Sequence, residues 1–130
     1  MHTEGAKSRV LVVDDDRLVA DTLAMVLKFS GYEVDTAYSG EDAIALALAA
    51  PYDMLVSDVM MEPMNGVQAA VAIRATCPTC RVVLMSGNER TSQVLAEAAH
   101  DGLHFRVLAK PVHPTVILDA LRSPTQVVDA

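Results

Sequence analysis

The sequence predicts an α/β protein with a five-stranded parallel sheet and helices on both faces. Short apolar runs rich in β-branched residues, such as residues 9–13, are typical of strands buried on both faces. Five expected strands alternate with stretches that have the apolar spacing of helices. No long linker or internal repeat interrupts this alternation, which favours right-handed connections within one parallel sheet.

The first run, at 9–13, ends at three consecutive aspartates. Apolar residues at helical spacing then predict a helix over 18–29, with Asp16 as its N-cap and Gly31 just beyond its end. Residues 33–38 alternate polar and apolar side chains. This alternation indicates a more exposed strand near an edge of the sheet.

An alanine-rich helix is expected over 39–50, because a Ser-Gly-Glu-Asp start precedes it and Pro51 follows its end. The apolar residues 54–57 predict the third strand, which ends at Asp58. A loop of Met, Pro, Asn and Gly comes next, and 66–77 has helical character.

The last third repeats the pattern twice. Strands are expected at 81–85 and 105–109, and helices at 92–100 and 113–122. We expect the folded domain to span 9–123, with an N-terminal tail at 1–8 and a C-terminal tail at 124–130.

Composition narrows the function classes. The 130 residues carry 10 Lys and Arg against 17 Asp and Glu, a net charge of −7. Such acidity disfavours direct binding to nucleic acid. No apolar run is long enough for a membrane span, and no signal sequence is evident, so we expect a cytoplasmic protein that does not bind membranes.

Polar side chains follow four of the five expected strands. They are Asp14 and Asp15, then Asp58, Ser86 and Lys110. The carboxyl ends of parallel strands meet at one edge of a sheet, where ligands bind. Carboxylates with room for water suit Mg²⁺, and a lysine and a hydroxyl could neutralise a transferring phosphoryl group. One aspartate could then accept that group as an acyl phosphate.

These residues lie in four segments that together resemble a known family. The segments are VLVVDDD at 10–16, VSDVMMEPMNG at 56–66, LMSGN at 84–88 and LAKP at 108–111. In order and spacing they resemble the receiver domain of two-component response regulators, over about residues 8–122. The resemblance implies a flavodoxin-like (βα)5 fold, related to chemotaxis regulators, with strand order 2-1-3-4-5.

The resemblance also implies roles for individual residues. Asp58 would be phosphorylated from the phosphohistidine of a partner. Asp15, Asp58 and the backbone carbonyl of Met60 would bind Mg²⁺, or Mn²⁺ in its place, and Asp14 would act through a metal-bound water. Lys110 would pair with Asp58 and later with the phosphoryl oxygens.

Ser86 would be the switch hydroxyl that moves toward the phosphoryl group together with the loop starting at Gly87. Lys110–Pro111 would be a cis peptide. The family usually has Tyr or Phe at the position of Val107, and the nearest aromatic residue is Phe105 on the same strand face. We therefore expect movement of the loop at 87–91 and little rearrangement of the last strand.

The loop after Asp58 also departs from the family. Glu62 stands where the family usually has proline, and Pro63 comes next. We expect this loop to run differently and Glu62 to add negative charge near the site. The apolar Met60 occupies a position that tunes access of water, so we expect a long-lived phosphoryl group.

The resemblance implies a signalling domain and not an enzyme. Its partners would be a sensor histidine kinase or a histidine phosphotransfer protein, and an effector that the sequence does not identify. It could act alone, shuttle phosphoryl groups in a relay, or belong to a larger protein. It would be a monomer or a weak homodimer through the face formed by 92–100, 105–109 and 113–122.

Two other interpretations deserve comparison. Asp14-x-Asp16 after an apolar strand also resembles haloacid-dehalogenase-like phosphatases, in which Asp14 would be the nucleophile. That reading leaves Asp58 without a role, and no paired acidic motif follows Lys110. Cys77-Pro-Thr-Cys80 could be a redox motif, but it follows the end of a helix, which disfavours a thiolate, so we expect it to be structural.

Overall fold

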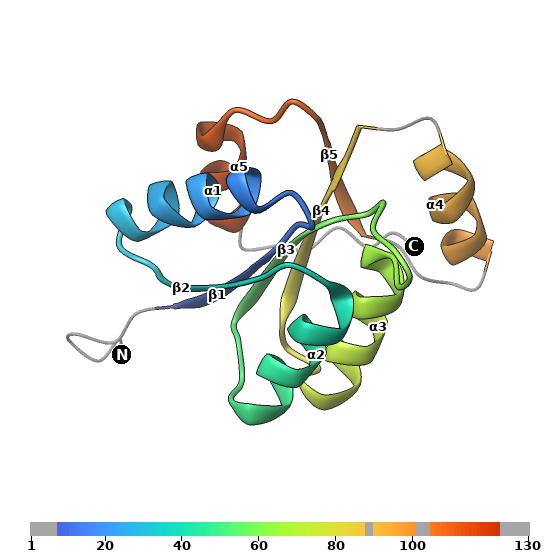
Figure 1. Ribbon diagram of the computed structural model, residues 1–130, viewed down its shortest axis with the longest axis horizontal. Coiled ribbons are helices and arrows are strands. Elements are labelled where there is room, and N and C mark those ends of the chain that lie inside the picture. The colour runs from blue at the N-terminus through green and yellow to red at the C-terminus, as the bar shows by residue number, and fades with distance from the viewer. Residues whose placement is uncertain (1–7, 88–89, 101–104, 123–130) are drawn as a thin grey trace.

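The computed structural model describes residues 8–87, 90–100 and 105–122. Strands and helices alternate throughout (Figure 1). The strands are β1 (Arg9–Val13), β2 (Glu33–Ala37), β3 (Met54–Asp58), β4 (Arg81–Ser86) and β5 (Arg106–Ala109). The helices are α1 (Arg17–Phe29), α2 (Gly40–Ala49), α3 (Gly66–Thr76), α4 (Arg90–His100) and α5 (Pro114–Arg122).

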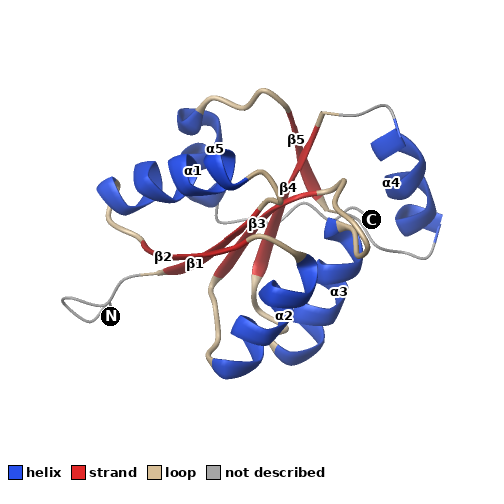
Figure 2. Cartoon of the chain, in the orientation of Figure 1, coloured by secondary structure: helices blue, strands red, loops and turns tan. Residues whose placement is uncertain are grey.

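The five strands form one parallel sheet in the order β2-β1-β3-β4-β5, which confirms the predicted fold class and places β2 at an edge. Helices α1 and α5 cover one face of the sheet, and α2 and α3 cover the other (Figure 2). Within the described ranges, no helix is long and apolar enough to cross a membrane.

Two apolar clusters, one on each face of the sheet, hold the layers together. Leu23 and Leu27 of α1 join Ile117 of α5 against one face. On the other face, Val67 and Ile73 of α3 pack with α2, and α4 adds partly buried side chains. Because β1, β3 and β4 are central and buried on both faces, their carboxyl ends are held in a fixed arrangement.

Local signals in the sequence explain where helices begin and end. Asp16 caps α1, because its side chain accepts hydrogen bonds from the N–H groups of Leu18 and Val19 at 3.1 and 3.3 Å. Gly31, with φ +101°, follows the end of that helix. The last helix begins one residue later than predicted, because His113 lies outside it and accepts a hydrogen bond from the N–H of Thr115 at 3.2 Å.

Other boundaries shift by one or two residues from the prediction. The fourth helix begins at Arg90 and not at Ser92. The last strand begins at Arg106, just after Phe105. The carbonyl of Ser8 accepts a hydrogen bond from the N–H of Glu33 at 3.0 Å and so extends the pairing of β1 with β2.

A cluster of polar side chains lies toward the end of the sheet opposite to Asp14 and Asp58. The hydroxyl of Tyr52 donates a 2.6 Å hydrogen bond to Asp35, and the guanidinium of Arg9 lies 4.4 Å from the centre of the Tyr52 ring. Arg9 also forms a 3.3 Å ion pair with Asp35. Burial, and then the hydrogen bond to Asp35, raise the pKa of Tyr52 from 10.0 to about 12.

This raised pKa predicts a loss of stability at alkaline pH. The pKa of Tyr52 in the folded protein lies above its ordinary value. The contribution of the neutral Tyr52 hydroxyl to the free energy of unfolding is therefore complete below pH 10.0 and is lost as the pH rises through about 12. We expect Tyr52→Phe to lower the free energy of unfolding by about 1–2 kcal/mol at neutral pH. The difference in free energy of unfolding between Tyr52→Phe and wild type, measured by urea unfolding, should then become smaller at alkaline pH. A difference that is independent of pH would contradict this prediction.

Candidate functional site: an acidic pocket at the carboxyl edge of the sheet

Three carboxylates meet at the carboxyl edge of the sheet. Asp14 and Asp15 follow β1 and Asp58 ends β3, and one oxygen atom from each lies within 4.8 Å of the other two. Asp14 and Asp58 are buried, with 1% and 8% of their surface exposed, whereas Asp15 is exposed. Three such groups repel one another unless a cation offsets their charge.

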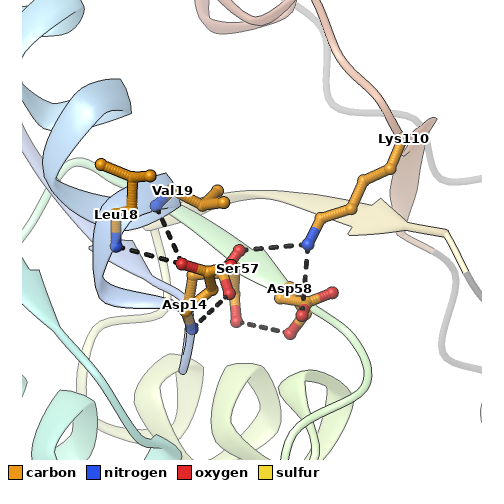
Figure 3. A network of polar contacts seen from close by, with 7 residues as sticks. Asp14, Leu18, Val19, Ser57, Asp58 and Lys110 are labelled. Atoms are coloured by element: carbon orange, nitrogen blue, oxygen red, sulfur yellow. Dashed lines mark hydrogen bonds and ion pairs between the residues drawn. The ribbon is translucent and has the colours of Figure 1, made fainter.

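Lys110 brings a positive charge to this cluster from the end of β5 (Figure 3). Its Nζ donates a 3.1 Å hydrogen bond to Asp14 and forms a 3.4 Å ion pair with Asp58. Burial of the ammonium group acts to lower the pKa of Lys110, but the charges of Asp58 and Asp14 outweigh it and raise the pKa. Lys110 is therefore held protonated between two carboxylates.

The single positive charge of Lys110 does not neutralise the three carboxylates. Burial raises the pKa of Asp58, the charge of Lys110 opposes this, and the nearby Asp14 raises the pKa further. A divalent cation beside the three carboxylates would favour the ionised form of Asp58. Oxygen ligands with one exposed carboxylate are the donor set that Mg²⁺ takes, because Mg²⁺ keeps several waters. The residues present thus fit a magnesium site.

Local contacts hold the Asp14 side chain and the Asp58 backbone in place. The N–H of Asp16 donates a 2.9 Å hydrogen bond to Asp14. The carbonyl of Asp58 accepts a 2.9 Å hydrogen bond from the hydroxyl of Ser57, which is fully buried. Gly66 begins α3 directly against the same carbonyl, since a Cβ atom at this position would lie 2.2 Å from the oxygen.

The end of β4 contacts Lys110. The carbonyl of Ser86 accepts a 2.7 Å hydrogen bond from the N–H of Lys110, and Ser86 is paired with Ala109 of β5. Ser86 is half-buried and Gly87 is exposed. A Cβ atom at Gly87 would lie 3.0 Å from the Cβ of Lys110, so the missing side chain leaves room for the lysine.

The loop after Asp58 contains the departures noted in the sequence. Met60 is half-buried and packs against the core on the α2–α3 side, while Glu62 and Pro63 are exposed. The Glu62–Pro63 and Lys110–Pro111 peptide bonds are both cis.

Phe105, just before β5, and Val107 within β5 contact the same side of the sheet. Phe105 and Val107 are both half-buried and pack against the same apolar cluster, in which Val107 pairs with Leu84. The guanidinium of Arg74, from α3, lies 5.8 Å from the centre of the Phe105 ring. Phe105 therefore packs against the apolar cluster that includes α3 residues, with the Arg74 guanidinium nearby.

The two cysteines take no part in this pocket. Cys77 and Cys80 are free thiols buried in the apolar core at the end of α3, as the structural interpretation predicted. Burial raises the pKa of Cys80 to about 12. A thiol of this kind is protonated and unreactive at neutral pH.

Sequence reasoning found the residues of the pocket but missed three of its contacts. The structure brings Asp14, Asp15, Asp58 and Lys110 together, and places Ser86 in the strand beside Lys110. It gives Lys110 a second partner, Asp14, where only Asp58 was expected. The contacts of Ser57 and Gly66 with the Asp58 carbonyl had no signal in the sequence beyond the residue types.

Comparison with known proteins identifies the family. A family model described as "Response regulator receiver domain" matches residues 10–122. The chain belongs to this family. It is therefore a receiver domain of two-component response regulators, a signalling domain. The haloacid-dehalogenase-like alternative is not favoured.

Individual relatives agree with this placement. The response regulator MprA of Mycobacterium avium (strain 104) is 34% identical over 88 residues, which are 68% of this chain and 39% of that protein. The chain thus spans about two fifths of the length of such curated relatives. The chemotaxis protein CheY4 of Vibrio cholerae is 29% identical, with a TM-score of 0.79 over 90% of this chain and 98% of that one.

A response regulator from Burkholderia pseudomallei was solved with a phosphorylated aspartic acid, a calcium ion and citrate. It is 28% identical, with a TM-score of 0.78 over 90% of this chain and 68% of that one. Receiver domains generally bind Mg²⁺ at an acidic pocket, and the three aspartates described above form a pocket of this kind.

Proposed function

We propose that this receiver domain, spanning 9–123, takes a phosphoryl group onto Asp58 from the phosphohistidine of a sensor kinase or phosphotransfer protein. The carboxylate oxygen of Asp58 forms the new P–O bond while the P–N bond breaks, and the imidazole nitrogen keeps the electron pair and takes up a proton. The observation that supports this is the buried pair of Asp58 and Asp14, bridged by Lys110 at 3.4 and 3.1 Å.

Asp15, Asp58 and the backbone carbonyl of Met60 would hold Mg²⁺, or Mn²⁺ in its place, and Asp14 would act through a bound water. The ion would offset negative charge on the phosphoryl oxygens. Lys110 would move its hydrogen bonds from the carboxylates to the new phosphoryl group. The Ser86 hydroxyl would then move toward that group together with the loop beginning at Gly87, part of which lies outside the described residues.

The direct test is phosphoryl uptake from a small donor such as acetyl phosphate, followed by intact-protein mass spectrometry. We expect wild type to gain one phosphoryl group with Mg²⁺ and none with a chelator. Asp58→Asn should gain none, whereas Asp119→Asn, at an exposed carboxylate of α5, should match wild type. Equal uptake by Asp58→Asn and wild type would overturn the proposal.

The surface beside Lys110 offers the donor protein an apolar contact. A groove of about 620 Å³ lies between α1 and the start of α5, with Leu18, Val112 and Ile117 among its lining residues. Leu18 is 75% exposed. A donor protein that buries this surface would contact the groove beside Lys110, which also contributes to its lining.

The phosphorylated protein would pass the signal on by binding another protein. We propose a monomer or weak homodimer through α4, β5 and α5, which presents an effector-binding face, either as a stand-alone switch or as a relay shuttle. Acetyl phosphate-treated protein used as bait in a host lysate would distinguish the two. Capture of a histidine phosphotransfer protein would support a relay, and capture of an effector would support a switch.

Met60 should set the lifetime of the phosphoryl group. It is a half-buried apolar side chain two residues after Asp58, and an acid there would help to orient an attacking water. We expect Met60→Glu to shorten the half-life of the phosphorylated protein by about tenfold, less than the roughly 10²–10⁴-fold effect of a fully positioned general base. The half-life is measured by mass spectrometry after donor removal, with Met60→Leu as the apolar control. An unchanged or longer half-life in Met60→Glu would contradict this prediction.

A further inference from the structure

Ser57 carries a buried hydroxyl next to the proposed acceptor. None of its surface is exposed, and it lies in β3 opposite Val13 of β1 and Leu84 of β4. A hydroxyl in such a place needs a hydrogen-bond partner. The partner is the backbone carbonyl of Asp58, at 2.9 Å (Figure 3).

The peptide group that links Asp58 to Val59 is held from several sides. Its carbonyl accepts the hydrogen bond from Ser57. Its N–H donates a 3.0 Å hydrogen bond to the carbonyl of Met85 in β4. Gly66 lies against the same carbonyl and donates its own N–H to the Val59 carbonyl at 2.8 Å. The plane of this peptide group sets the direction in which the Asp58 side chain leaves the strand.

Without the hydroxyl, the Asp58 carbonyl would lose this donor, and the peptide group would be held less firmly, by the Val59 N–H bond to Met85 and the contact with Gly66. The carboxylate would then leave its position 3.4 Å from Lys110 for part of the time. Reaction rates depend steeply on the placement of the reacting atoms, so a small rotation of the acceptor slows attack on phosphorus.

We propose that Ser57 is a positioning residue for phosphoryl uptake, which orients Asp58 through its hydrogen bond to the Asp58 carbonyl. This inference rests on the proposed function, in which Asp58 is the acceptor. It assigns to the hydroxyl a role in the rate of the folded protein, beyond any contribution to stability.

Two matched pairs of side chains isolate the hydroxyl. Serine and alanine differ by this group alone. Threonine and valine have nearly the same shape, but threonine has a hydroxyl where valine has a methyl group. We expect Ser57→Ala to take up phosphoryl groups from acetyl phosphate about fivefold more slowly than wild type at saturating Mg²⁺, the size of one lost hydrogen bond. Ser57→Thr should react within about twofold of wild type, and Ser57→Val as slowly as Ser57→Ala.

Unfolding in urea and Mg²⁺ affinity are measured on the same four proteins. A purely structural role would lower the free energy of unfolding of Ser57→Ala and Ser57→Val but leave the uptake rate of the folded protein unchanged. Equal rates for Ser57→Thr and Ser57→Val would therefore overturn the inference while leaving Asp58 as acceptor. Uptake by Asp58→Asn at the wild-type rate would instead overturn both proposals.

Discussion

Gly66→Ala is expected to destabilise the protein by about 3 kcal/mol, at the upper end of overpacking effects. A Cβ atom at this position would lie 2.2 Å from the Asp58 carbonyl oxygen and 3.0 Å from the Cα of Val59. Both are backbone atoms of a central strand and its continuation, which cannot move aside as a flexible side chain can. Helix propensity alone predicts the opposite sign, since alanine is favoured over glycine within helices.

Chemical denaturation measures this difference, and Gly31→Ala is the matched control. Gly31 has φ +101° and open space around its Cα, so that alanine there meets no atom and carries only backbone strain of about 1–2 kcal/mol. We expect the loss at Gly66 to exceed the loss at Gly31. A Gly66→Ala protein as stable as wild type would show that α3 does not begin against the Asp58 carbonyl.

Lys110→Met is expected to slow phosphoryl uptake by about 10²-fold, the size seen when one group that stabilises transition-state charge is removed. The ammonium lies 3.1 Å from Asp14 and 3.4 Å from Asp58, and the carboxylates repel each other without it. The methionine keeps the length of the side chain and its packing beside Gly87 but removes the charge.

Uptake from acetyl phosphate is followed by mass spectrometry, with Lys28→Met at the exposed end of α1 as the control. NMR spectra add a second measurement. In wild type we expect the amide signals of Ser86 and Gly87 to shift on phosphorylation, while those of β5 change little because Val107 replaces an aromatic residue. Uptake by Lys110→Met within twofold of wild type would contradict the role of the lysine. Shifts confined to the aspartates would contradict movement of the loop.

The order of elements could be predicted from the sequence because β1, β3, β4 and β5 are short apolar runs that end at or just before a polar residue, and β2 alternates polar and apolar residues. The carboxyl ends of parallel strands share one edge, so Asp14, Asp58 and Lys110 could be placed together although Lys110 is 96 residues from Asp14. The apolar spacing over 18–29 predicted α1, but not every apolar residue in it packs on the sheet: Leu23 and Leu27 are buried, whereas Leu18 is 75% exposed.

Close contacts between backbone segments could not be predicted in the same way. The approach of Gly66 to the Asp58 carbonyl depends on the path of the intervening loop, which no periodic pattern describes. The hydrogen bond from Ser57 to the Asp58 carbonyl depends on the side-chain rotamer of Ser57. The sequence indicates only that Ser57 lies in a strand. Likewise, the stacking of Arg9 on Tyr52 joins the starts of two strands through side-chain geometry alone.

Asp58, and not Asp14, is expected to carry the phosphoryl group. Reduction of the phosphorylated protein with borohydride converts an aspartyl phosphate into homoserine, which peptide mass spectrometry can locate. We expect homoserine at position 58 and unmodified aspartate at positions 14 and 15. Homoserine at position 14, with aspartate intact at position 58, would contradict phosphorylation at Asp58.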